Sequence, residues 1–337
     1  MQTNQANLFL KYILPGVLIS AVFTVVIGLT TANLSGFQIV GRTVPFAYPW
    51  RLTEPNAMAR LTAWTGYLLH NLIAWSILFL AQREKPKFGN DLRWFNWAMI
   101  ATTLVFIVLH IFQTQLFYDG LARDVPEVTA QGSVAIMLMI IIIFETPRRG
   151  LIFGRKFKFK DGFMQIARKY HGYFFAWAII YTFWYHPTEG TWGHLMGFLY
   201  MFMLFAQSSL IFNRAHLNRW WTVSLEIFVI IHGTVVALLQ GSEMWTMFAF
   251  GFGAMFFLTQ MYGLGLNTWT KRSLAIGFIV LITAYYALAG NLGRLNEVIR
   301  IPMIDYIFIF LLYGIYLGFN WLINLFKRPE PVQASTD

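Results

Sequence analysis

Long apolar runs recur along the chain and alternate with short polar loops. We identify ten of them, each near the length that crosses about 30 Å of hydrocarbon as an α-helix. Runs such as Val134–Phe144 do not alternate between apolar and polar positions, which excludes the strands of a membrane barrel. The pattern therefore predicts an all-α, polytopic integral membrane helix bundle of about 10 transmembrane helices. The predicted spans are 10–32, 60–82, 94–117, 129–146, 165–185, 191–212, 219–240, 244–265, 273–290 and 303–326.

The basic residues predict how the bundle is oriented. Most of the 25 Lys and Arg residues lie at the chain ends and in every second loop, above all between Arg148 and Lys169. Because cytoplasmic loops of membrane proteins carry an excess of basic residues, we expect both termini and these loops to be cytoplasmic, at a cell inner membrane. The net charge of +10 is thus explained without nucleic acid, and the basic loop is expected to contact membrane lipids.

Composition narrows the chemistry further. The chain is 57% hydrophobic and 12% charged, and it contains no cysteine. The lack of cysteine excludes disulfides, thiol catalysis, iron–sulfur clusters and thiolate metal sites. The loops are too short for a soluble domain, so residues 1–337 are predicted to form a single transmembrane domain. Sub-bundles 1–146 and 165–326 are an alternative division at the basic cytoplasmic loop 147–164.

The seven histidines are the candidates for function, because an imidazole inside a bilayer is costly. His70 lies near the middle of the second span, and a structural hydrogen bond to a neighbouring helix accounts for it. His110 and His232 lie about two thirds of the way toward the outer face of the third and seventh spans. His186 and His194 flank the outer loop between the fifth and sixth spans. A shared outer-leaflet site is therefore expected among the histidines His110, His186, His194 and His232.

Four histidines also form two spaced pairs. His171 and His186 are fifteen positions apart along one predicted span, and His216 and His232 are sixteen apart along another. This spacing resembles the two-histidines-per-helix pattern of transmembrane dihaem cytochromes b and of ferric-reductase-like membrane domains. The resemblance covers about residues 168–234. It implies b-type haem held by the inner pair, His171 and His216, and by the outer pair, with electron transfer across the bilayer and a redox partner or quinone.

Helix geometry places a condition on this pairing. Fifteen steps along an α-helix return to within about 60° of the starting face, whereas sixteen steps end about 160° away. His216 and His232 would then face opposite directions, unless the expected turn at Asn213–Asn218 re-aims His216. A single haem between His110 and His232 avoids the problem, because these two residues lie at similar depth.

Two other classes of function stay open. His186, Glu189 and His194 provide three ligands for zinc or another transition metal, as in a metal-dependent membrane enzyme acting on a lipid or amphiphile at the outer face. The alternative is a transporter or a structural membrane subunit, in which Glu226 is the candidate for a proton or ion pathway. Other readings of Glu226 are a partner to His171 or Arg168, a snorkelling acid, or a structural hydrogen bond or ion pair.

Overall fold

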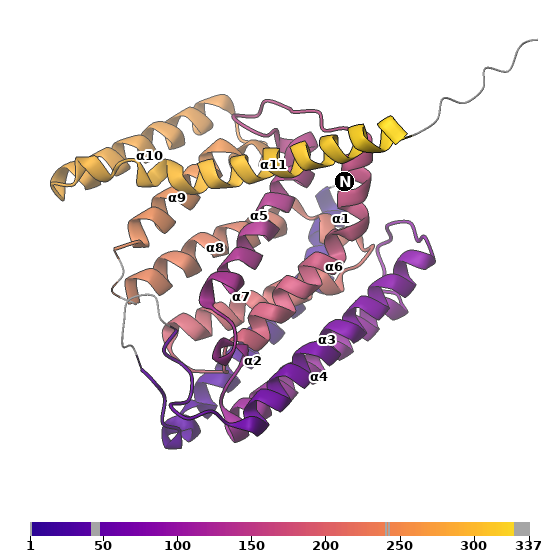
Figure 1. Cartoon of the computed structure of the whole chain (residues 1–337). Helices are drawn as coiled ribbons and strands as arrows, with labels where there is room; N and C mark the ends of the chain where they lie inside the picture. Colours follow the sequence, from indigo (N-terminus) through magenta and orange to yellow (C-terminus); the bar gives the residue numbers. More distant parts are fainter. Residues whose placement is uncertain (1, 42–47, 240, 242, 327–337) are drawn as a thin grey trace, which may run out of the picture.

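The computed structural model describes residues 2–41, 48–239, 241 and 243–326. Every regular element in these ranges is helical, and each predicted span overlaps one of the helices α2 to α11 (Figure 1). The helices are α1 (Gln2–Leu8), a π-helical turn (Phe9–Ile13), α2 (Leu14–Thr30), α3 (Ala57–Arg83), α4 (Trp94–Phe117), α5 (Glu127–Arg149), α6 (Asp161–Tyr185), α7 (Trp192–Ser209), α8 (Arg219–Leu239), α9 (Trp245–Leu258), α10 (Thr268–Leu288) and α11 (Glu297–Phe326). Short 3-10 helices cover Thr31–Gly36, Leu121–Arg123, Arg214–Leu217, Gln260–Gly263 and Leu292–Arg294.

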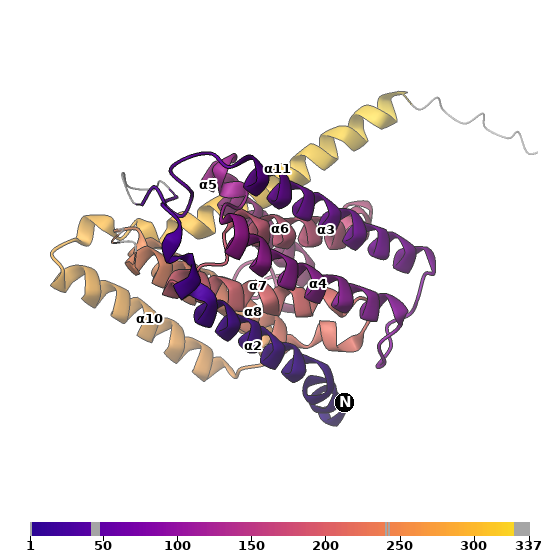
Figure 2. The same ribbon diagram turned by 90° about the horizontal axis from the view of Figure 1, so that it is seen from below.

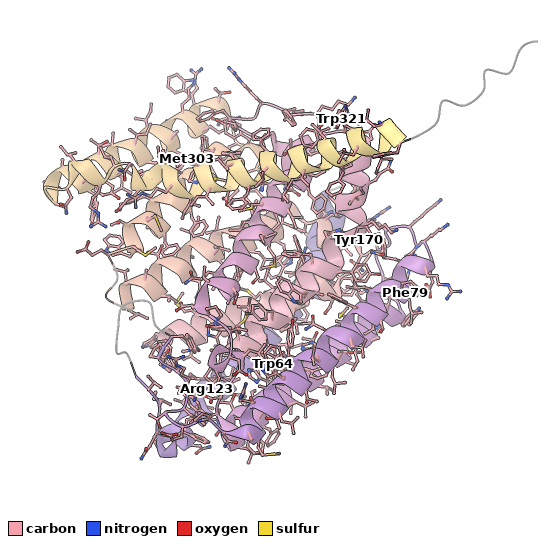
Figure 3. All side chains as sticks on the ribbon, viewed as in Figure 1. Trp64, Phe79, Arg123, Tyr170, Met303 and Trp321 are labelled. Carbon is pink, nitrogen blue, oxygen red and sulfur yellow. The ribbon has the colours of Figure 1, made fainter. Side chains whose placement is uncertain are left out.

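Seven segments in the described ranges are long and apolar enough to cross a membrane, and they contain α2, α3, α4, α5, α8, α10 and α11. The other three helices that overlap predicted spans are shorter or more polar: α9 has 14 residues, α7 has 18, and α6 carries Arg168 and Lys169. Large apolar side chains are exposed around the bundle, including Phe79, Met303 and Trp321 (Figure 3). Apolar exposure on this scale is that of a protein surrounded by hydrocarbon.

The helices pack as a chain of neighbours across the bundle. Helices α3 and α4 lie together at one edge, α6 and α7 occupy the middle, and α10 and α11 lie at the far edge (Figures 1 and 2). The largest apolar core draws on α2, α3 and α4 as well as α6 and α7. The two sub-bundles considered from the sequence therefore share one core.

The basic loop is shorter than the predicted 147–164. Helix α5 continues through Pro147 to Arg149 and ends at Gly150, whose φ of +81° favours glycine. Helix α6 already begins at Asp161. Apolar content predicts only the part of a helix that lies in hydrocarbon. Helices α5 and α6 continue beyond that part into the polar boundary of the membrane, so the loop between them is shorter than predicted.

A buried ion pair joins α5 to α8. The Nη1 atom of Arg149 donates to both carboxylate oxygens of Glu226, at 3.0 and 2.9 Å, and both side chains are almost fully buried. The reading of Glu226 as a member of a structural ion pair is therefore confirmed, with Arg149 rather than His171 or Arg168 as the partner. Arg149 is the last residue of α5, where the sequence had indicated only a loop residue.

Removing the charge of Glu226 is expected to destabilise the bundle. Glu226→Gln leaves the Arg149 guanidinium buried without a counter-ion, a change that costs about 3–5 kcal/mol in buried pairs. The exposed pair of Glu243 with Arg294 provides the control, because the Glu243 side chain is 87% exposed. Thermal unfolding in detergent should show a clear fall in Tm for Glu226→Gln and almost none for Glu243→Gln. Equal Tm values would contradict a stabilising role for the buried pair.

Candidate functional site

A hydrogen-bonded chain of side chains lies where α6 ends and α7 begins, which we call the outer end after the orientation expected from the sequence. The Tyr48 hydroxyl contacts His186 Nδ1 at 2.8 Å and His194 Nε2 at 2.9 Å. The Nδ1 atom of His194 is in turn 2.8 Å from the Thr191 hydroxyl, which also caps the start of α7. Tyr48 comes from the loop between α2 and α3, so this loop fastens the ends of two central helices.

The ionisation state of this chain follows from burial. Burial raises the pKa of Tyr48 well above its ordinary value, so the phenol keeps its proton. Burial, together with the nearby His194, His232 and His110, lowers the pKa of His186 well below 6.5. The outer end therefore holds a neutral His186 against a protonated Tyr48. The phenol has a single hydrogen, so at most one imidazole accepts from it and at least one donates to its oxygen.

His110 is held by two acceptors. Its Nδ1 lies 3.1 Å from Gln113 Oε1, and its Nε2 lies 2.8 Å from the His186 carbonyl oxygen. The Gln113 orientation is set because its amide nitrogen donates to the Asp119 carbonyl at 2.9 Å. Both ring nitrogens thus point at protein oxygens, and neither is free to bind iron. The arrangement does not fit a haem held between His110 and His232.

His232 differs from the other outer histidines. Its Nδ1 is buried and has no hydrogen-bond partner among the described residues. The ring lies so close to α7 that a Cβ added at Gly197 would be 3.0 Å from His232 Cε1. A buried polar atom without a partner is costly, so this nitrogen marks a place where a bound group would be stabilised.

A hollow of about 500 Å³ opens beside this chain at the outer end. Trp50 and Thr191 line it, and both also contact His194: the Trp50 ring lies edge-on at 4.5 Å between centroids. Val236 of α8 closes the other side. A molecule in the hollow would be separated from the imidazoles by a single layer of side chains.

The three proposed metal ligands are not assembled. Glu189 Oε1 accepts a hydrogen bond from the Tyr118 hydroxyl at 2.6 Å, and the His186 and His194 rings are bridged by Tyr48. Within the described ranges, no three His, Asp or Glu side chains are grouped so that they could hold a metal ion. The His186, Glu189 and His194 set does not fit zinc in this arrangement.

An inner pair of histidines lies toward the opposite end of the bundle. The Nδ1 atom of His171 donates to the Arg168 carbonyl at 2.8 Å, and that of His216 donates to the Gln207 carbonyl at 3.1 Å. His216 sits in the 3-10 turn Arg214–Leu217, before α8 begins, so the α-helical spacing argument does not govern its direction. Burial and the nearby His171 lower the pKa of His216 to about 4.

His70 takes the structural role expected for it. It is buried, its ring stacks on Phe106 at 4.4 Å, and Trp184 Nε1 donates to its Nδ1 at 3.4 Å. Glu226 lies apart from these histidine groups in its ion pair with Arg149.

Sequence reasoning missed two polar residues of the interior. Tyr48 lies in a loop without periodic structure, and its only signal was that the loop is rich in aromatic residues and proline. Arg149 was assigned to the basic loop by its neighbours. Comparison with protein-family models, with curated proteins and with solved structures finds no match. Function is therefore argued from the site itself.

Acidification is expected to destabilise the protein when no cofactor is bound. His186 and His216 are neutral in the folded state, whereas in the unfolded chain they take up protons as the pH falls below about 6.5. The unfolded state then binds more protons, so stability is retained above about pH 6.5 and lost below it, by about 1.4 kcal/mol per pH unit for each such histidine. For His216 the loss continues down to its folded pKa of about 4. Tm measured from pH 7.5 to 5 should fall, and His216→Gln should flatten the fall; a Tm that rises on acidification would show that these rings are charged when folded.

Proposed function

We propose that the chain crosses a cell inner membrane about ten times, with both termini in the cytoplasm. Helices α6, α7 and α9 join the seven more apolar segments as spans, because the bundle surrounds α6 and α7 and reduces their contact with lipid. The basic residues of the loop between α5 and α6 support the orientation. The histidines His171 and His216 then lie toward the cytoplasm, and the outer histidines toward the opposite side.

We infer further that the protein is a membrane electron-transfer protein that binds b-type haem. The observation that carries this proposal is the inner pair. Both rings donate Nδ1–H to a backbone carbonyl, which fixes the tautomer. The Nε2 atom of each ring then carries the lone pair that can bind iron. The low pKa of His216, which His171 helps to lower, indicates two neutral imidazoles near each other. Neutral, oriented imidazoles from two segments are what a bis-histidine haem requires.

The outer candidates for a second haem are His186 and His232. The contact between Nδ1 of His186 and the Tyr48 hydroxyl restrains the His186 ring. The His232 ring still lacks a hydrogen-bond partner for its Nδ1 atom among the described residues. When bound, haem supplies a one-electron redox centre. The chain's own contribution is to orient the rings, to keep them unprotonated and to exclude water through the surrounding aromatic side chains.

The outer hollow favours a second candidate function, an enzyme acting on a lipid or other amphiphile at the outer face. Thr191 and Trp50 line the hollow and contact His194, so the His194, Tyr48 and His186 chain could exchange a proton with a molecule bound there. The third class, a transporter using Glu226, has less support because Arg149 already pairs with this carboxylate.

Optical spectra of the purified protein test the haem proposal. Protein expressed with sufficient haem should show a Soret band that shifts on reduction, and His216→Ala should lose the part due to the inner haem. His110→Gln is the matched control, because His110 has no free nitrogen, and it should keep that part of the spectrum. A colourless wild-type protein would overturn the proposal, and a colourless protein with stoichiometric zinc would favour a metal enzyme.

Single-cysteine labelling tests the orientation, since the chain has no cysteine of its own. In intact cells, a membrane-impermeant maleimide should label Trp192→Cys, whose parent side chain is 73% exposed at the outer end, and should not label Lys158→Cys. Both variants should react after the membrane is permeabilised. The reverse labelling pattern would place the basic loop outside the cytoplasm.

A further inference from the structure

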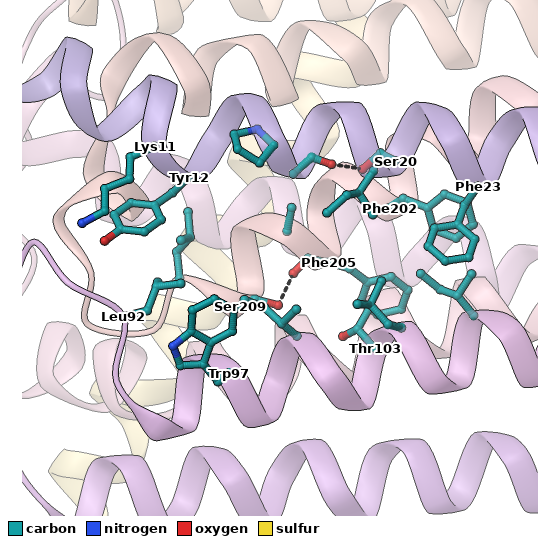
Figure 4. A pocket seen from close by; sticks show the side chains of 18 of the residues that line it. Lys11, Tyr12, Ser20, Phe23, Leu92, Trp97, Thr103, Phe202, Phe205 and Ser209 are labelled. Carbon is teal, nitrogen blue, oxygen red and sulfur yellow. Dashed lines mark hydrogen bonds between the residues drawn. The ribbon is translucent and has the colours of Figure 1, made fainter.

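A groove of about 600 Å³ lies between α2 and α4, with α7 as its floor (Figure 4). It is separate from both histidine groups, and none of the seven histidines lines it. Ile19 and Trp97 stand at its sides and are 44% and 60% exposed, so the groove opens toward hydrocarbon. The ion pair of Lys11 and Asp91, 3.0 Å apart, lies at the end near the start of α2 and α4.

The deep end of the groove is aromatic. Phe23 of α2 and Phe202 and Phe205 of α7 gather there (Figure 4), and the rings of Phe23 and Phe202 meet edge to face at 6.1 Å. The two serines of the groove are not available to a ligand as donors. Ser20 Oγ donates to the Gly16 carbonyl at 2.7 Å, and Ser209 Oγ donates to the Phe205 carbonyl at 2.8 Å.

Thr103 breaks this pattern. It lines the groove near the middle of α4, its residue is 6% exposed, and its Oγ1 has no hydrogen-bond partner among the described residues. Two other buried helical threonines have partners: Thr146 Oγ1 donates to the carbonyl four residues earlier at 2.7 Å, and Thr246 Oγ1 donates to Glu297 at 2.7 Å, whereas the half-buried Thr234 of α8 also has an unpartnered hydroxyl. A buried hydroxyl without a partner carries a cost that a ligand with a hydrogen-bond acceptor would remove.

The depth of Thr103 restricts that acceptor. Thr103 is the tenth residue of α4, so its hydroxyl lies about 14 Å along the helix from Trp94, near the middle of the hydrocarbon. The ester carbonyls of a glycerolipid sit beside its head group at the membrane boundary and would not reach this depth. A ligand that does reach it must carry its carbonyl on an otherwise apolar body, and the phenylalanine rings favour a flat ring as that body.

We propose that this groove binds a prenylated quinone. The quinone ring lies among Phe23, Phe202 and Phe205, and the Thr103 hydroxyl donates to one ring carbonyl. The isoprenoid tail leaves through the open side between Ile19 and Trp97, which is also the route of entry from the bilayer. Binding of this ligand does not depend on haem.

The groove also adjoins the outer histidine chain through aromatic contacts. Phe202 lies 5.9 Å from Phe198, and Phe198 lies 6.4 Å from the His194 ring. A quinone in the groove would thus be separated from the outer histidines by two aromatic rings. If the haem proposal holds, this proximity makes the quinone the electron-transfer partner at the same site; that extension alone rests on the proposed function.

Photoaffinity labelling tests the proposal on the purified full-length protein. An azido-quinone should attach to peptides of α2, α4 or α7, and a short-chain quinone should compete for the site. Thr103→Val keeps the shape of the side chain and removes its hydroxyl, and it should weaken competition roughly five- to tenfold, the effect of one lost hydrogen bond. Thr102→Val is the matched control, since Thr102 does not line the groove, and it should leave the affinity unchanged.

A second variant guards against a weak hydrogen-bond effect. Ile100 lines the groove and is half-buried, so Ile100→Trp should fill it and abolish labelling while the protein remains folded. Labelling outside α2, α4 and α7, full affinity in Thr103→Val, or equally strong competition by a phospholipid would overturn the proposal. Quinone labelling of a colourless protein would reject the haem proposal alone, and a haem spectrum without labelling would reject the quinone site alone.

Discussion

Hydrocarbon offers no hydrogen bonds, and this constraint determines what the interior of the bundle can contain. The backbone satisfies itself within helices, and polar side chains must find partners inside the protein. The Glu226 carboxylate does so by accepting from Arg149 Nη1, and Ser20 and Thr146 do so by donating to carbonyls of their own helix. Tyr48 satisfies two imidazoles at once.

Ten buried side-chain atoms in the described ranges have no hydrogen-bond partner, and two of them lie at the proposed binding places. The Nδ1 atom of His232 and the Oγ1 atom of Thr103 lie in different parts of the bundle, and neither has a partner in the described ranges. A buried polar group without a partner is costly, and this cost supports the proposals of a ligand at these two places. The inner histidines carry the complementary signal, because their Nδ1 atoms are satisfied by backbone carbonyls and their Nε2 atoms are then oriented.

Apolar length was a good guide to the helices and a poor guide to their ends. It predicted a helix in each of ten ranges, but helix ends are set by local contacts, such as the Asn56 side chain that accepts from Met58 N and Ala59 N at the start of α3. Apolar content also overestimated the length of α9, which ends at Leu258 and is followed by a 3-10 helix. Length alone gives no reason for the Thr259 backbone to leave the helix there.

Depth along the helices was enough to group the outer histidines, but not to name their partners. A count of residues places His186 and His194 at one level, whereas the hydroxyl between them comes from Tyr48, about 140 residues away in the chain. The turn expected at 213–218 is confirmed, so the helical angle does not apply to His216, but the sequence did not indicate that its Nδ1 would donate to the Gln207 carbonyl. Partners brought by distant loops leave no periodic trace in a single sequence.

Helix α10 contrasts with the polar interior, because most of its residues are exposed on the surface of the bundle. Of its residues, Ile282 and Tyr286 are buried, Phe278 and Tyr285 are half-buried against α9, and most of the others face outward at the edge of the bundle (Figure 2). Lipid chains can pack around apolar side chains of any shape. Most positions of α10 can therefore exchange one apolar side chain for another at little cost in free energy. Evolution is accordingly free to change the outward positions of this helix, provided that its hydropathy and the residues packed against α9 persist.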